Sequence, residues 1–267
     1  GLQIDLLNNG NLRAQLKNNG CFSGDDCRIL GYTNPSLLNN QWHHIAFAFG
    51  MSASDTSRLY VNGVQVGTCS PSAPPTFTTS SSFDFIIGDS TETDKEEFKG
   101  VIDDVRVYDR QLTADDIMAL ATTFPDDLPC NAAYEAVMIY NEDESVLQYC
   151  NGSQWIDMGP PGINNDITDG LVGHWALDET GNTSIATDST GTSDGNLTNF
   201  PADPTADWVT GQVGGGLDFT RASSEYIDVP YNAALQVPAS GGTLMGWFNS
   251  DLANIGQNTS ARIIKLS

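Results

Sequence analysis

Apolar and polar residues alternate along much of this chain, and this alternation restricts it to a β-rich fold more than any other feature. Ile45, Phe47 and Phe49 share one face of the run HHIAFAF, which is the period of two expected for a strand with one buried face. RLYVNGVQVG places Asn62 and Gly63 between two similar runs, which predicts a type I′ hairpin. Many such runs, separated by Gly, Asn, Ser and Thr, predict an all-β antiparallel sandwich.

One short helix interrupts the predicted strands. In LTADDIMALA, Thr113 can cap the helix and Asp116 follows three residues later, as in a capping box. Ile117 and Leu120 would then share the buried face of this helix.

The charge of the chain excludes several classes of partner. Its 34 acidic and 11 basic residues give a formal net charge of −23. Phosphate binding depends on Lys and Arg, so we expect no nucleic-acid partner. No apolar run approaches the roughly 18 residues of a membrane span, so none is predicted. The acidic surface suits divalent cations, although simple solubilisation is the plainer interpretation.

Five cysteines indicate an oxidising compartment, and therefore a secreted or cell-surface protein. Cys130 and Cys150 bracket a predicted hairpin, and Cys21 and Cys27 bracket a short polar loop, so each pair is a predicted disulfide. Cys69 is then left over, either buried and free or bonded to another chain.

Composition divides the chain into three parts. Residues 1–124 and 171–267 contain long strand candidates, whereas residues 125–170 form a small Cys-bracketed β module followed by a Pro/Gly/Asn linker. A unit as small as this module builds little core and depends on a cystine.

The two long parts carry a family resemblance. FKGVIDDVRVYDRQLTADDIMALA (98–121) and QWHHIAFAFGMSASDTSRLYVNGVQVGT (41–68) resemble the closing half of laminin-G-like, concanavalin A-type jelly-roll domains. LVGHWALDETGNTSIATDSTGTSDGNLTN (171–199), with the later Leu-Asp-Phe, Tyr-Ile-Asp-Val and Trp strands, is similar to the opening half of the same domain. The resemblance implies a jelly-roll sandwich.

The order of the two halves is reversed relative to that family. The closing half (1–124) comes first and the opening half (171–267) comes last, so that ARIIKLS at 261–267 would continue into GLQIDLL at 1–7. Three arrangements explain this order: a window of a tandem array, a polymerising subunit that completes its neighbour by strand complementation, or a circular permutant.

The resemblance also implies a Ca²⁺ site, because family members often hold the ion between the opening acidic loop and the closing Ile-Asp-Asp strand. The matching residues are Asp103, Asp104, Asp178, Glu179 and Asp188. Carboxylates and loop carbonyls are the ligands that Ca²⁺ prefers. The alternative is that these side chains cap turns and bind backbone.

No catalytic motif is recognised. The Glu-x-Asp-x-x-Glu spacing of retaining glycosidases on this fold is absent, and no motif supplies a Ser or Cys partner for His43, His44 or His174. We therefore expect no enzymatic activity, and packed or hydrogen-bonded histidines. Trp155 and Trp208 lie in irregular surroundings and are the candidates for stacking on a sugar ring.

These observations favour a non-enzymatic, extracellular structural or adhesive protein that associates with itself in an array or filament. The alternative is a carbohydrate-binding module of a larger secreted enzyme, with a glycan as its ligand.

Overall fold

The computed structural model divides the chain into two compact units. Gly1–Ala121 and Gly170–Ser267 together form the first unit, and Thr122–Asp169 form the second. The structure describes residues 2–16, 27–31, 37–52, 54–70, 85–88, 98–121, 138–141, 146–153, 155–157, 167–220, 223–235, 241–250 and 260–266. Below, "closing half" denotes residues 1–121 and "opening half" denotes residues 170–267.

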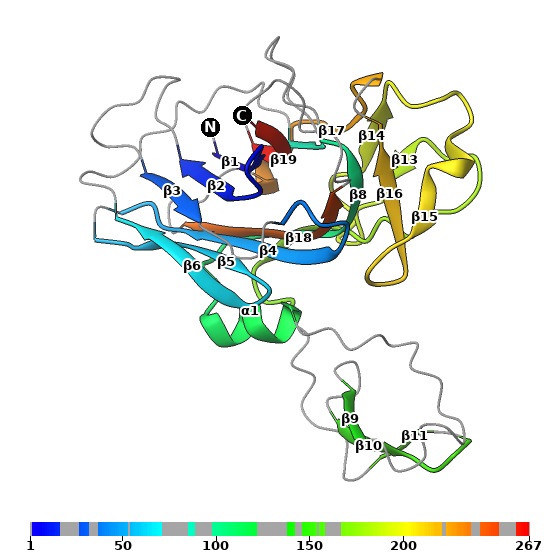
Figure 1. The fold of residues 1–267 in the computed structure, drawn as a ribbon, viewed down its shortest axis with the longest axis horizontal. Helices are drawn as coiled ribbons and strands as arrows, with labels where there is room; N and C mark the ends of the chain where they lie inside the picture. Colours follow the sequence, from blue (N-terminus) through cyan, green and yellow to red (C-terminus); the bar gives the residue numbers. More distant parts are fainter. Residues whose placement is uncertain are drawn as a thin grey trace. The chain divides into compact units, whose positions relative to one another are not determined.

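The first unit consists of two antiparallel sheets (Figure 1). The spatial order of the first sheet is β13 (Ile185–Ala186), β14 (Gly195–Thr198), β17 (Tyr226–Val229), β7 (Phe85–Ile87), β19 (Ser260–Leu266), β1 (Leu2–Leu7), β2 (Leu12–Leu16) and β3 (Cys27–Gly31). The order of the second is β15 (Trp208–Thr210), β16 (Gly215–Phe219), β8 (Gly100–Tyr108), β18 (Gly242–Ser250), β4 (Trp42–Phe49), β5 (Ser57–Val61) and β6 (Val64–Cys69), with β12 (Leu171–Trp175) also paired to β8. This architecture confirms the predicted antiparallel sandwich.

The two halves interleave in both sheets. In the second sheet, β18 of the opening half lies between β8 and β4, which both belong to the closing half. In the first sheet, β7 of the closing half lies between β17 and β19 of the opening half. Each half therefore contributes a strand that lies between two strands of the other half, and neither half contains a continuous sheet.

The terminal strands pair with each other along their whole length. β1 and β19 are antiparallel, with Leu2 opposite Leu266 and Leu7 opposite Ser260 (Figure 1). The register shifts once, between Ile4 and Asp5. Within this chain, ARIIKLS thus pairs with its own GLQIDLL, and the seam between the halves lies in the middle of a sheet.

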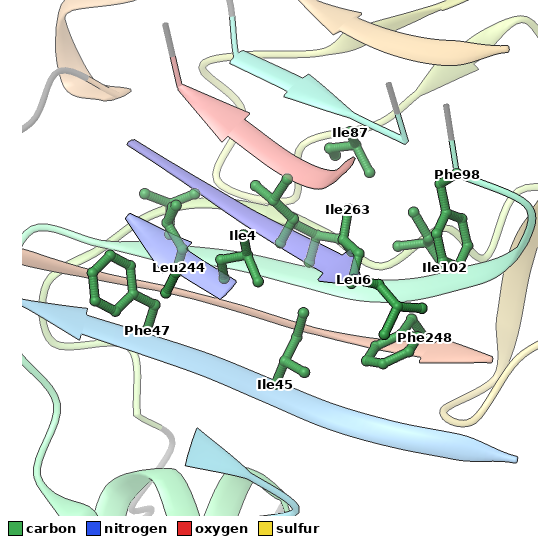
Figure 2. Packing of buried hydrophobic residues seen from close by; sticks show 14 of the residues in the cluster. Ile4, Leu6, Ile45, Phe47, Ile87, Phe98, Ile102, Leu244, Phe248 and Ile263 are labelled. Carbon is green, nitrogen blue, oxygen red and sulfur yellow. The ribbon is translucent and has the colours of Figure 1, made fainter. Parts of the chain in front are cut away.

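The core lies between the two sheets and is filled from both halves. Figure 2 shows Ile4, Ile45 and Phe47 of the closing half packed with Leu244 and Ile263 of the opening half. These side chains are all nearly inaccessible to solvent. At roughly 25 cal/mol per Å² of buried apolar surface, such packing is the main force holding the halves together.

Local signals in the sequence explain the elements that border the sheets. Asn62 and Gly63 both have positive φ, 49° and 75°, as a type I′ turn between β5 and β6 requires. The helix α1 (Ala114–Ala121) begins with the expected capping box, since Asp116 N donates to Thr113 Oγ1 and Thr113 N donates to Asp116 Oδ2.

Gly100 begins β8 with a φ of 131°, a conformation that other residues rarely adopt. A Cβ at this position would overlap the carbonyl oxygen of Asn249 in β18. This glycine therefore permits the close approach of the two halves.

The second unit contains a three-stranded sheet of β11 (Trp155–Asp157), β10 (Val146–Cys150) and β9 (Met138–Asn141). The short 3₁₀ helices η1 (Pro204–Ala206) and η3 (Ala233–Leu235) belong to the first unit. Within the described part of the chain, no helix is long and apolar enough to cross a membrane.

Candidate functional site

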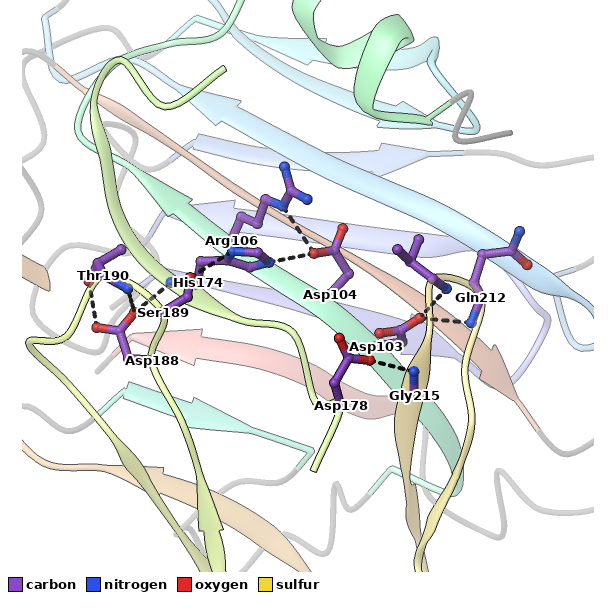
Figure 3. A network of polar contacts seen from close by, with 11 residues as sticks. Asp103, Asp104, Arg106, His174, Asp178, Asp188, Ser189, Thr190, Gln212 and Gly215 are labelled. Atoms are coloured by element: carbon purple, nitrogen blue, oxygen red, sulfur yellow. Dashed lines mark hydrogen bonds and ion pairs between the residues drawn. The ribbon is translucent and has the colours of Figure 1, made fainter. Parts of the chain in front are cut away.

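A bulge in β8 directs two consecutive aspartates toward different partners. Opposite Met245–Trp247 of β18, the pairing register of β8 shifts between Arg106 and Asp103, and Asp104 has a φ of 50°. Bulges commonly redirect side chains beside functional sites. Here Asp103 contacts the turn between β15 and β16, whereas Asp104 contacts β12 (Figure 3).

Asp103 is fully buried, and one of its two carboxylate oxygens accepts hydrogen bonds. Its Oδ2 accepts hydrogen bonds from the backbone N–H groups of Gln212, at 2.7 Å, and Val213, at 2.8 Å. Its Oδ1 has no hydrogen-bond partner among the residues that the structure describes. Burial raises the pKa of Asp103 to about 7; the two backbone hydrogen bonds oppose this rise, and the charges of Asp104 and Asp178 add to it.

Asp104 joins the two halves through His174. Its Oδ1 lies 2.7 Å from His174 Nε2 and accepts a hydrogen bond from Arg106 Nε at 3.0 Å. Although burial alone would raise the pKa of Asp104, the hydrogen bond from His174 and the charge of Arg106 lower it to about 2. On its other side, His174 Nδ1 lies 2.9 Å from Ser189 Oγ (Figure 3).

Asp188 organises its own loop. Its carboxylate accepts hydrogen bonds from the backbone N–H groups of His174, Thr190, Thr192 and Ser193 and from the Thr190 hydroxyl. These hydrogen bonds, led by that of the Thr190 side chain, lower its pKa despite the opposing effect of burial. Both oxygens of the Asp188 carboxylate are therefore already engaged in hydrogen bonds.

The five predicted Ca²⁺ ligands are not brought together as one site. Among the residues that the structure describes, no group of three or more His, Cys, Asp or Glu side chains could hold a metal ion. Asp104 and Asp188 are occupied by protein donors, and Glu179 Oε1 accepts from Thr187 N–H at 2.6 Å.

What remains of the predicted cation site is Asp103 with Asp178. The charge of Asp178 acts on Asp103, and Asp178 Oδ1 accepts a hydrogen bond from Gly215 N–H. Among the described residues, Asp103 Oδ1 and Glu179 Oε2 are buried oxygens of the predicted ligands without a hydrogen-bond partner, and they still suit a cation. These carboxylates nevertheless fall short of the six to eight oxygens that Ca²⁺ requires.

A second polar cluster crosses the β1–β19 seam. Asp5 of β1 is fully buried and accepts hydrogen bonds from Arg13 Nε at 2.7 Å and from Arg262 Nε of β19 at 3.3 Å. Gln3 Nε2 also donates to this carboxylate, at 2.8 Å from Oδ2. The pairing of β1 with β19 thus includes a buried ion pair in addition to apolar packing.

The histidines in β4 differ from each other. His43 Nε2 lies 2.9 Å from Asn39 Oδ1, as expected for a hydrogen-bonded strand residue. His44 is fully buried against the Trp247 ring, and neither of its ring nitrogens has a hydrogen-bond partner in the described part of the chain. Burial lowers the pKa of His44 to about 3.

The structure describes the side chain of one of the two predicted sugar-binding tryptophans. Trp208 is half-buried, packs against the core and donates from its indole nitrogen to the Thr183 carbonyl at 3.2 Å. The backbone of Trp155 lies in β11, and its side chain is outside the described residues. Stacking of either ring on a sugar stays a prediction.

Cys69 and Cys150 are each disulfide-bonded. The described residues do not include the side chains of Cys21, Cys27 and Cys130. Because the partner of Cys69 is one of the other four cysteines, at most one of the predicted pairs Cys130–Cys150 and Cys21–Cys27 can form. The expectation that Cys69 has no partner within the chain is wrong.

Sequence reasoning missed the contacts of His174 with Ser189 and of Asp5 with Arg262. Backbone pairing between distant segments brings these side chains together. Such pairing leaves no short motif in the sequence that would predict the contacts. Asp188 is predicted as a Ca²⁺ ligand or, alternatively, as a turn cap, and Ser189 has no predicted role. The bridge between Trp175 and Asp188 places Ser189 beside His174.

Comparison with known proteins agrees with this architecture. Residues 1–118 match a laminin-G-type family model described as the concanavalin A-like lectin/glucanases superfamily. The match covers most of the closing half and supports the laminin-G-like jelly roll. Neither curated proteins nor solved structures gave a match.

Proposed function

We propose that this protein is an extracellular structural or adhesive component whose copies associate by exchanging halves of the jelly roll. The interleaving of the halves in both sheets carries the proposal, because each half leaves a gap in each sheet that only the other half fills. An isolated half would expose unpaired strand edges and half a core, which promotes association.

The contacts between the halves do not depend on which copy supplies each half. Within the sequence, the halves are joined through residues 122–169, which form a compact unit of their own. The β1–β19 ladder, the Asp5–Arg262 contact and the Asp104–His174 contact each join one half to the other. A second copy would present the same groups, so the same contacts could join two chains. Exchange of identical elements is a low-cost route to assembly, and head-to-tail exchange produces an array.

The disulfide-bonded Cys69 and Cys150 support an extracellular location, since such bonds persist in oxidising compartments. The strongly acidic composition supports a protein that does not bind nucleic acid.

Complementation between two full-length variants tests the exchange. Leu244→Asp damages only the opening half and Ile45→Asp only the closing half, because both side chains are fully buried in the shared core. Neither variant should fold alone. After joint refolding, the intact halves of the two variants should form one jelly roll, recovering the near-ultraviolet circular dichroism signal and a dimeric mass.

The matched control combines Leu244→Asp with Phe248→Asp, which damage the same half. This mixture contains no intact opening half and should stay unfolded. Recovery in neither mixture would show that the halves join only within one chain, and recovery in both would show that the lesions are too mild for the test.

Carbohydrate binding is the second candidate, and the lectin members of the matched superfamily favour it. A glycan screen followed by Trp208→Ala and Trp155→Ala tests it. Affinity for a defined glycan that is lost in either variant would support a sugar-binding module, whereas unchanged affinity would remove these two residues from the site.

A further inference from the structure

Three side chains at the junction of the halves form a continuous hydrogen-bonded relay. Ser189 Oγ lies 2.9 Å from His174 Nδ1, and His174 Nε2 lies 2.7 Å from Asp104 Oδ1 (Figure 3). An ionised carboxylate only accepts hydrogen bonds, so the imidazole proton resides on Nε2. The lone pair of the neutral ring is then at Nδ1 and faces the Ser189 hydroxyl, which donates to it.

Backbone pairing fixes the members of this relay. His174 lies in β12 opposite Arg106 of β8, and Ser189 N–H donates to the His174 carbonyl at 2.8 Å. Asp104 occupies the bulge of β8 with a positive φ, a strained conformation of the kind that concentrates at functional sites. The relay is therefore preorganised by two strands and a bridged loop.

The relay runs from solvent toward the interior. Ser189 is exposed, the His174 side chain keeps 19% of its accessible surface and the Asp104 side chain keeps 5%. Arg106 Nε also donates to Asp104 Oδ1, which keeps the buried carboxylate charged. An accessible hydroxyl next to a base, which a buried third group orients, is the arrangement of an activated nucleophile.

We propose that Ser189 is a nucleophile that accepts acyl groups from activated esters, with His174 as its general base and Asp104 as the positioning residue. Ser189 Oγ attacks the ester carbonyl carbon while its proton moves to His174 Nδ1. The carbonyl–oxygen bond to the leaving group breaks, and the phenolate or alcohol departs, taking the proton from His174 or from water. Water then attacks the acyl-serine by the same route, releasing the carboxylic acid and restoring Ser189.

The loop limits which esters can react. The backbone N–H groups of Ser189, Thr190 and Gly191 already donate to the His174 carbonyl, Asp188 Oδ1 and the Asp188 carbonyl. These amides are thus unavailable to stabilise an oxyanion, a contribution that is usually large. The substrate class is therefore aryl and similarly activated esters, whose leaving groups need little assistance.

p-Nitrophenyl acetate is a suitable probe for the full-length chain. Mass spectrometry of fragments would compare acetylation of Ser189 with that of Ser54, an exposed serine whose Oγ lies 2.8 Å from another hydroxyl, Ser52 Oγ. General-base assistance typically contributes 10²- to 10⁴-fold, so Ser189 should react at least about 100-fold faster than Ser54.

Variants separate nucleophilic activation from a purely structural contact. Ser189→Ala should abolish the fast acetylation and Ser54→Ala should leave it unchanged. His174→Ala should lower the Ser189-to-Ser54 ratio at least tenfold, and free imidazole should partly restore the ratio. A structural contact would not respond to imidazole.

Equal acetylation of Ser189 and Ser54 in the unaltered protein would overturn the proposal, even if the His174 variant failed to fold. A high ratio that survives His174→Ala in a folded protein, as judged by circular dichroism, would overturn the role of His174.

Discussion

Replacing Asp103 by Asn should make the protein more stable above neutral pH. The Asn side chain keeps an oxygen that accepts from Gln212 and Val213. At the position of Oδ1, which has no hydrogen-bond partner among the described residues, it places an uncharged amide that the charge of Asp178 does not repel. The substitution thus removes a buried charge and preserves the hydrogen bonds that hold the turn between β15 and β16.

The size of the effect follows from the pKa of Asp103, which burial raises from 3.8 to about 7. Because the folded chain holds this proton more tightly than the unfolded chain, the stability that Asp103 contributes is present below pH 3.8 and is lost as the pH rises toward 7. Each pH unit in this window costs about 1.4 kcal/mol, so the total loss approaches roughly 4 kcal/mol. Asn does not titrate and suffers no such loss.

Urea unfolding of both proteins at pH 4, 6 and 8, followed by tryptophan fluorescence, measures the difference. The advantage of Asp103→Asn should be small at pH 4 and should grow to roughly 2–4 kcal/mol at pH 8. Asp115→Asn on the exposed surface of α1 controls for the loss of one negative charge. An advantage that stays constant with pH, or that reverses, would refute the reasoning.

The same variant tests the predicted Ca²⁺ site. If Ca²⁺ binds the ionised Asp103, calcium chloride should raise the stability of the unaltered protein at pH 8 and leave Asp103→Asn unchanged. No response in either protein would remove the ion from the site without affecting the pH argument.

Two further substitutions test other buried charges. His44→Leu should remove an acid sensitivity: burial lowers the pKa of His44 to about 3, so the stability it contributes is lost as pH falls below 6.5, by roughly 2.7 kcal/mol at pH 4.5. The free energies of unfolding of the unaltered protein and of His44→Leu, measured at pH 7 and 4.5, would show this difference. An equal loss of stability in the two proteins at pH 4.5 would exclude His44 as the cause. Asp5→Ala should cost about 3–5 kcal/mol because it removes the fully buried carboxylate that contacts both Arg262 and Arg13, whereas Arg13→Ala, on a more exposed partner, should cost less. Thermal unfolding compares the two variants. A larger loss of stability in Arg13→Ala than in Asp5→Ala would contradict a major contribution of the Asp5–Arg262 contact to stability.

The sequence by itself determined the local elements of this fold. The alternation around Ile45 and Phe47, the Asn62-Gly63 turn and the Thr113–Asp116 capping box each involve neighbours within a few residues, so their geometry follows from backbone preference and periodicity. The laminin-G-like pattern likewise depends on strand order and spacing, which are visible in one dimension.

Only the tertiary structure decided how the halves combine and what their junction contains. The insertion of β18 between β8 and β4 and the pairing of β19 with β1 join residues more than 100 positions apart, and no local preference specifies such contacts. The bulge at Asp104 was equally invisible, because its conformation is strained and is maintained by the surrounding sheet. For this reason the aspartates predicted as one metal site separate in three dimensions, with Asp103 left partly unsatisfied and Asp104 directed to His174 and Ser189.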